Sequence, residues 1–174
     1  MSFFTHLSIR AFVGRRSRVR LGRQQWGSLI VELEHRAGGV RESGAFLLAS
    51  RSGPPTKVKR IVYFDEVDPN CLTGGISMSS SGFSALWRIC SDERLRVIAD
   101  IHTHPGADVR QSPDIDALNP MVAVAGHVAV IIPDLGRHAI APDECGVHVY
   151  RGSHQWASSF KGEAARLLYV GRWP

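Results

Sequence analysis

The sequence has few cysteines and no long apolar run. Its three cysteines lie far apart among 174 residues, at Cys71, Cys90 and Cys145, so they suggest neither a disulfide framework nor a C-x-x-C metal knuckle. No apolar stretch approaches the ~20 residues that a membrane-spanning helix needs. Internal repeats and low-complexity stretches are also missing. These absences predict one globular domain in a reducing compartment, the cytoplasm, without a membrane partner.

Acidic residues are absent from the first 25 residues, which carry six arginines. The rest of the chain is close to neutral, so this segment accounts for the net charge of +5. A nucleic-acid-binding arm and a transit peptide share this composition. Apolar and polar residues roughly alternate in "HLSIRAFVG" and "RVRL", however, which favours edge strands with an arginine-rich face. We therefore divide the chain into a basic edge segment, 1–25, and a domain over 26–174.

Hydrophobic patterns beyond this segment predict helices and strands in a mixed order. Apolar residues at helical spacing indicate a helix over 24–37, which Gly38 and Gly39 end. Further helices are expected over 84–95, from Ser112-Pro113 onwards, and in the closing segment 155–171. Strands are expected at 42–50, 58–67, 96–105, 127–134 and 147–152. The order predicts an α/β (α+β) fold with a single mixed β-sheet flanked by helices.

The stretch "ADIHTHPGADVRQSPDID" places two histidines one residue apart at a strand end. Because side chains alternate along a strand, His102 and His104 share one face and can reach one metal ion. Ser112-Pro113 is typical of a helix start, and Asp114 and Asp116 follow it. Two histidines, one carboxylate and water form a catalytic zinc site. Taken by itself, the H-x-H pair could instead be the partly exposed end of a strand that binds no metal.

Hydrolysis at such a site needs a base that accepts a proton from water. Glu42 is the candidate, since it precedes an apolar strand and would lie at the strand's rim, although an exposed loop carboxylate would look the same. The other histidines suggest no chemistry. His127 begins an apolar strand and is expected to be structural, and His148 is expected on a strand surface.

Together these residues resemble the JAB/MPN metalloprotease family, also called JAMM. The family pattern is an upstream glutamate on a strand, H-[ST]-H-P, a seven-residue spacer, a serine and an aspartate three residues later. Glu42, His102-Thr103-His104-Pro105 and Ser112 follow this pattern, and the resemblance covers about residues 26–150. It implies the MPN/JAB fold, which is cytidine-deaminase-like.

The resemblance also implies roles for the site residues. Zn²⁺ would be held by His102, His104 and an aspartate. Glu42 would serve as the general base and Ser112 would help to stabilise the oxyanion.

One departure concerns the third ligand, because Ile115 stands where the family has aspartate. A one-residue shift would bring Asp116 to the ligand position, and "DALNPM" after it is similar to the D-x-x-N-P expected in bacterial relatives. We therefore predict Asp116 as the ligand, with Asp114 as the alternative in the first helical turn. Ile115 is then expected to face the core.

The resemblance implies a zinc-dependent isopeptidase or peptidase that cleaves after the C-terminal glycine of a ubiquitin-like protein. Bacterial members of this deubiquitinase-like type accompany activating and conjugating enzymes of ubiquitin-like systems, some of them linked to phage defence. A non-catalytic MPN-type scaffold that binds partner proteins is one alternative, motivated by Ile115. A zinc hydrolase of a small amide substrate is another.

Overall fold

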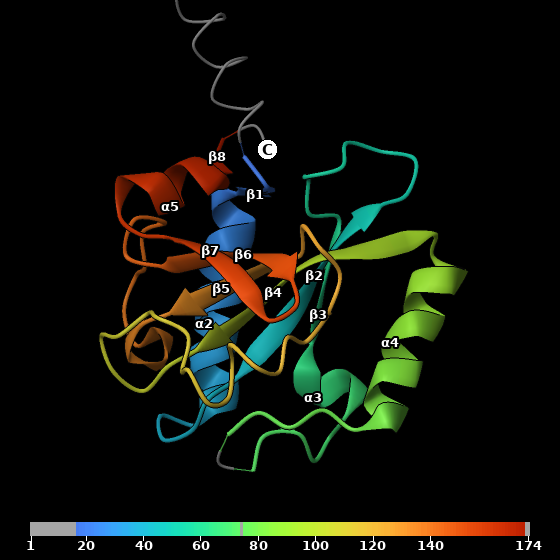
Figure 1. Ribbon diagram of the computed structural model, residues 1–174, viewed down its shortest axis with the longest axis horizontal. Coiled ribbons are helices and arrows are strands. Elements are labelled where there is room, and N and C mark those ends of the chain that lie inside the picture. Colours follow the sequence, from blue (N-terminus) through green and yellow to red (C-terminus); the bar gives the residue numbers. More distant parts are fainter. Residues whose placement is uncertain (1–16, 74, 173–174) are drawn as a thin grey trace, which may run out of the picture.

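A six-stranded sheet forms the centre of the computed structural model, which describes residues 17–73 and 75–172 (Figure 1). The spatial order of the strands is β3 (Arg60–Tyr63), β2 (Gly44–Ser50), β4 (Leu95–Thr103), β5 (Val128–Ile132), β6 (Gly146–Gly152) and β7 (Gln155–Ser159). β4 and β5 run parallel, and the other neighbours are antiparallel. A separate two-stranded parallel ribbon pairs β1 (Val19–Gly22) with β8 (Leu168–Gly171).

Within the described residues, four helices accompany the sheet: α2 (Arg23–Ala37), α3 (Phe64–Val67), α4 (Ser80–Asp92) and α5 (Gly162–Leu167). A short 3₁₀ turn follows β5 at Asp134–Gly136. The predicted helix over 24–37 is confirmed as α2, whose buried residues recur at helical spacing. Gly38 ends it with φ of 56°, a left-handed conformation that glycine adopts at little cost.

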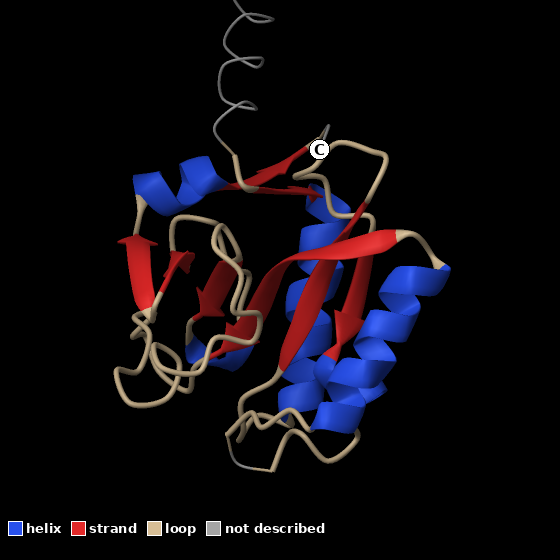
Figure 2. Ribbon diagram, turned by 45° about the vertical axis from the view of Figure 1, so that its right-hand side comes forward, coloured by secondary structure: helices blue, strands red, loops and turns tan. Residues whose placement is uncertain are grey.

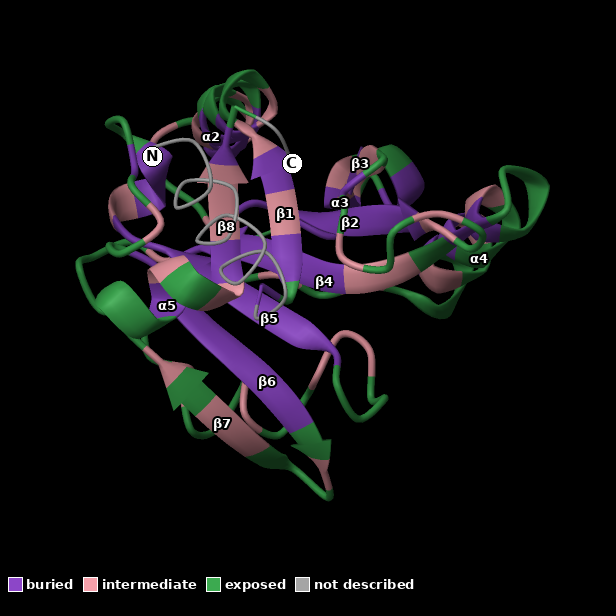
Figure 3. Ribbon diagram, turned by 90° about the horizontal axis from the view of Figure 1, so that it is seen from above, coloured by how far each residue is buried: buried purple, intermediate pink, exposed green. Residues whose placement is uncertain are grey.

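The two faces of β2 build two separate parts of the core. Ala45 and Leu47 pack in a cluster with residues of α2, whereas Phe46 and Leu48 pack in a second cluster with residues of α3 and α4. Figure 2 shows these helices on opposite sides of the strands. Figure 3 shows β5 and β6 as largely buried and β7, at the edge, as mostly exposed or intermediate.

The expected fold class, a mixed sheet flanked by helices in an α+β protein, is confirmed. Two local predictions are wrong. The segment from 112 forms turns instead of a helix, and residues 64–67 form α3 instead of extending a strand. The closing segment contains the expected helix, α5, and also the strands β7 and β8. Residues 1–16 of the basic segment lie outside the described residues. Within its remainder, Val19–Gly22 forms β1.

The cysteines form no disulfide: Cys71, Cys90 and Cys145 are all free and buried. In the part of the chain that the structure describes, no helix combines the length and apolar character needed to cross a bilayer.

Gly44, the first residue of β2, has no room for a larger side chain. A Cβ atom there would stand 2.3 Å from the Phe64 ring and 2.7 Å from the Ile101 carbonyl oxygen. Gly44→Ala should therefore lower the free energy of unfolding by about 1–3 kcal/mol, as overpacking does. Urea titration checks this value. Gly27 of α2 has open space around it, so Gly27→Ala is the control and should raise stability by about 0.5–1 kcal/mol. Equal stability of Gly44→Ala and the wild type would contradict the packing argument.

Candidate metal site

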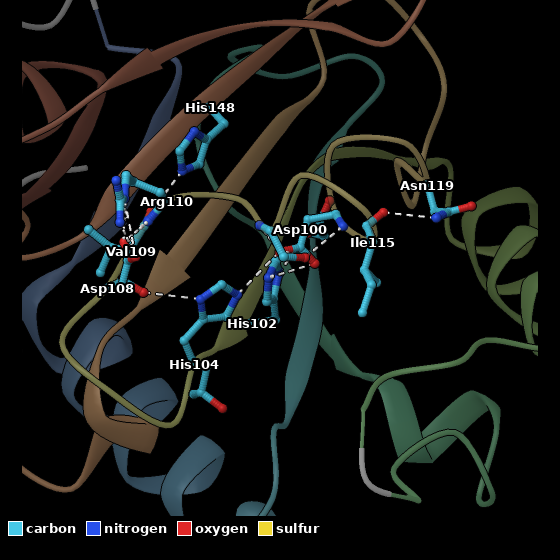
Figure 4. A network of polar contacts seen from close by, with 12 residues as sticks. Asp100, His102, His104, Asp108, Val109, Arg110, Ile115, Asn119 and His148 are labelled. Carbon is cyan, nitrogen blue, oxygen red and sulfur yellow. Dashed lines mark hydrogen bonds and ion pairs between the residues drawn. The ribbon is translucent and has the colours of Figure 1, made fainter.

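Three sequence-predicted ligands meet at the end of β4. Figure 4 shows two of them, His102 and His104. His102, His104 and Asp116 each offer one ligand atom, and these atoms lie within 4.8 Å of one another. Asp116 Oδ1 is 3.8 Å from His102 Nε2, and Asp116 Oδ2 is 3.4 Å from His104 Nε2. The alternation of side chains along β4 places His102 and His104 together, and the turn over residues 112–116 adds Asp116. The group could hold a metal ion.

Both imidazole rings present the Nε2 atom to this group. His104 Nδ1 lies 3.1 Å from the carbonyl oxygen of Asp108, and His102 Nδ1 lies 3.5 Å from Asp100 Oδ2. An acceptor beside Nδ1 favours the proton on that nitrogen and leaves the Nε2 lone pair for a metal. His102 Nε2 is buried and has no hydrogen-bond partner among the described residues.

An unsatisfied buried nitrogen is costly, so a metal ligand role accounts for His102 Nε2. Two imidazoles and a carboxylate fit Zn²⁺, and imidazole ligands also suit other divalent transition metals. The residues present therefore fit a metal of this class.

Asp116 is held by Ser112 through reciprocal hydrogen bonds. The backbone N–H and the hydroxyl of Ser112 donate to Asp116 Oδ2 at 2.7 and 2.9 Å. The backbone N–H of Asp116 donates to Ser112 Oγ at 3.1 Å. These bonds close a turn in which Asp114 is exposed. Ile115 is 64% exposed and lines the cavity beside the metal group, so the expectation that it faces the core is wrong.

Charge interactions within the group favour the ionised carboxylate. Burial alone would raise the pKa of Asp116, but the hydrogen bond with His104, the charge of His102 and the bonds from Ser112 hold that pKa well below its usual range. Burial lowers the pKa of His104, but its contacts with Asp116 outweigh this effect and raise it. A carboxylate that stays ionised is the form that binds a cation.

Glu42 lies in the same cavity, which has a volume of about 510 Å³ and contains all three candidate ligands. The Ser43 N–H donates to Thr103 Oγ1 at 3.0 Å, and the Thr103 N–H donates to the Ser43 carbonyl at 2.9 Å. These bonds join the residues just beyond the ladder of β2 and β4. The carboxylate of Glu42 lies close enough to His104, His102 and Asp116 to interact with their charges. Burial raises the pKa of Glu42, which brings the carboxylate closer to the range of a general base at neutral pH.

Sequence reasoning missed Asp100 as part of this site. Asp100 is 2% exposed and contacts both His102 and His127. His148 is buried, contrary to the expectation of a strand surface, and its ring bonds Ser158 Oγ at 2.8 Å and the Val109 carbonyl at 3.0 Å. Asp100 was detectable, because a residue two positions before His102 faces the same side of the strand.

No family model matches the chain. The fold is similar to the solution structure of a protein from Desulfitobacterium hafniense, with a TM-score of 0.56, 13% sequence identity, and 87% of this chain and 92% of that chain covered. The chain also aligns with a JAB1/MPN domain protein from Archaeoglobus fulgidus at a TM-score of 0.38 and 13% identity, over 82% and 97% of the two chains. At 13% identity, the likeness to the Desulfitobacterium hafniense protein concerns the fold and not the chemistry.

The geometry predicts which aspartate matters for metal binding. Asp116→Ala removes one of the three candidate ligands, so zinc affinity should fall by more than the roughly 10–100-fold that loss of an outer-shell partner costs. Asp114→Ala changes an exposed carboxylate of the same turn and should leave zinc affinity close to that of the wild type. Competition titration with a chromophoric chelator measures both. Greater loss in Asp114→Ala than in Asp116→Ala would contradict the assignment.

Proposed function

We propose that the chain is a zinc-dependent peptidase or isopeptidase that cleaves the bond after the C-terminal glycine of a ubiquitin-like protein. The observation that carries this proposal is the convergence of His102, His104 and Asp116 with the carboxylate of Glu42 in one cavity. The substrate class comes from the sequence resemblance to JAB/MPN metalloproteases, since the cavity itself supports only the reaction type.

The donor set supports hydrolysis. A zinc ion in this site would act as a Lewis acid, lowering the pKa of water and polarising the substrate carbonyl. Glu42 would accept a proton from the attacking water and return it to the leaving amine. Ser112 would hold Asp116 in place through the bonds described above.

The cavity walls supply two surfaces for a substrate. One is the loop between α3 and α4, from which Thr73, Gly75 and Ser77 line the cavity. The other is the turn region after Ser112 together with Trp156 of β7, whose indole N–H donates to the Ala117 carbonyl at 3.0 Å. An extended glycine-rich tail could bind here through backbone hydrogen bonds, as peptides do when they add to a strand edge.

Substitution of Glu42 tests the reaction. In the zinc-loaded protein, Glu42→Gln should retain the metal, because Glu42 is not one of the three ligands, and should lower kcat by about 10²–10⁴-fold. The assay uses an isopeptide-linked ubiquitin dimer and a fluorogenic Gly-Gly amide peptide as probes, with zinc content measured in parallel.

Glu163→Gln is the matched control, since Glu163 is exposed on α5 and pairs only with Arg166 among the described residues. Its activity should equal that of the wild type. Full activity of Glu42→Gln would refute the proposed base. If the protein binds zinc and cleaves the small amide peptide but not the ubiquitin dimer, the alternative of a hydrolase for small amide substrates is favoured. If the wild-type protein binds no zinc, the alternative of a non-catalytic scaffold is favoured.

A further inference from the structure

A buried carboxylate lies behind the metal group, between two imidazoles. Asp100 Oδ1 is 2.6 Å from His127 Nε2, and Asp100 Oδ2 is 3.5 Å from His102 Nδ1. The side chains of Asp100 and His127 are each 2% exposed. A buried carboxylate persists only where it is paired and hydrogen-bonded, so these contacts explain why an aspartate occupies the middle of β4.

The contact with Asp100 determines which nitrogen of His102 faces the cavity. A neutral imidazole has one N–H donor and one acceptor nitrogen, while an ionised carboxylate only accepts. Opposite Asp100, the favoured form of His102 carries its proton on Nδ1. Its lone pair then lies on Nε2, the buried atom that faces Asp116 and has no hydrogen-bond partner among the described residues.

His127 holds the carboxylate from the other side. It immediately precedes β5, and its backbone is fixed by two hydrogen bonds: its N–H donates to the Val124 carbonyl at 3.0 Å, and its carbonyl accepts from the Tyr150 N–H at 2.9 Å. Its backbone is therefore anchored independently of the metal group. The 2.6 Å contact to Oδ1 keeps Asp100 from rotating away from His102.

We propose that Asp100 and His127 are positioning residues for His102, and that they hold its Nε2 atom towards the metal ion. The inference rests on the proposed metal site and adds two residues to it. His127 acts through Asp100, at a sequence distance of 27 residues. Carboxylates that fix a metal-bound histidine in this way commonly contribute 10–100-fold to metal affinity.

A first experiment needs no metal and separates this inference from the proposed function. Nitrogen-15 NMR of the metal-free full-length protein at neutral pH reports the tautomer of each histidine, and His102→Gln identifies the signals of His102. The expected result is a proton on Nδ1 of His102. A proton on Nε2 would overturn the inference. If the wild-type protein binds no zinc, the proposed function is refuted. The tautomer of His102 in the metal-free protein would still test the contact with Asp100.

A second experiment uses two substitutions of similar size at His127. The amide N–H₂ of Gln can donate to Asp100 from the place of the imidazole Nε2, whereas Leu has no donor. His127→Leu should weaken zinc binding by about 10-fold or more, and His127→Gln should restore most of the wild-type affinity. Co²⁺ absorption spectra should change in the Leu variant and resemble the wild type in the Gln variant.

Equal zinc affinity in the Leu and Gln variants would overturn the positioning role. If His127→Leu does not fold, Asp100→Asn decides by the same titration, with weaker binding expected and wild-type binding contradicting the inference. Asp68→Asn is the matched control, because Asp68 is 8% exposed, accepts a hydrogen bond from the Ser79 N–H at 2.7 Å and lies outside the metal group. It should lower thermal stability without changing zinc affinity.

Discussion

The register between β2 and β4 is the constraint on which the candidate site depends. Paired positions of an antiparallel ladder place their side chains on the same face. Gly44 pairs with His102 at the end of the ladder. Glu42 lies two residues before Gly44, and His104 lies two residues after His102. A slip of one residue would turn Glu42 to the opposite face. The apolar packing of β2 against α2 and α4 therefore also fixes the distance between the proposed base and the proposed ligands.

The buried His148 and the candidate ligand His104 both depend on the loop that follows β4, over residues 105–111. Gly146 of β6 leaves room for this loop, since a Cβ atom there would stand 2.0 Å from the Val109 carbonyl oxygen. His148 then bonds that carbonyl and Ser158, so its ring is satisfied although buried. The neighbouring Asp108 carbonyl faces His104. The loop thus satisfies the buried ring of His148 and orients the candidate ligand His104 at the same time.

The fold class and the paired histidines could be predicted because they depend on short sequence periods. Apolar spacing gave α2, and alternation along β4 placed His102 and His104 on one face. The contact of Asp100 with His127 could not be predicted in this way, because it depends on the parallel pairing of β4 with β5. The burial of His148 likewise depends on where the loop at Val109 packs. Such contacts follow from tertiary arrangement, which local patterns do not encode.

The turn over residues 112–116 explains how the site tolerates an aspartate one residue away from the spacing of the family it resembles. In a helix, adjacent side chains point ~100° apart, so a displaced aspartate would miss the histidines. The reciprocal bonds of Ser112 and Asp116 close a turn instead, which exposes Ile115 and directs Asp116 inward. Because Oδ2 accepts both bonds from Ser112, Oδ1 remains free to face His102. In this geometry the Ser112 hydroxyl orients the ligand carboxylate.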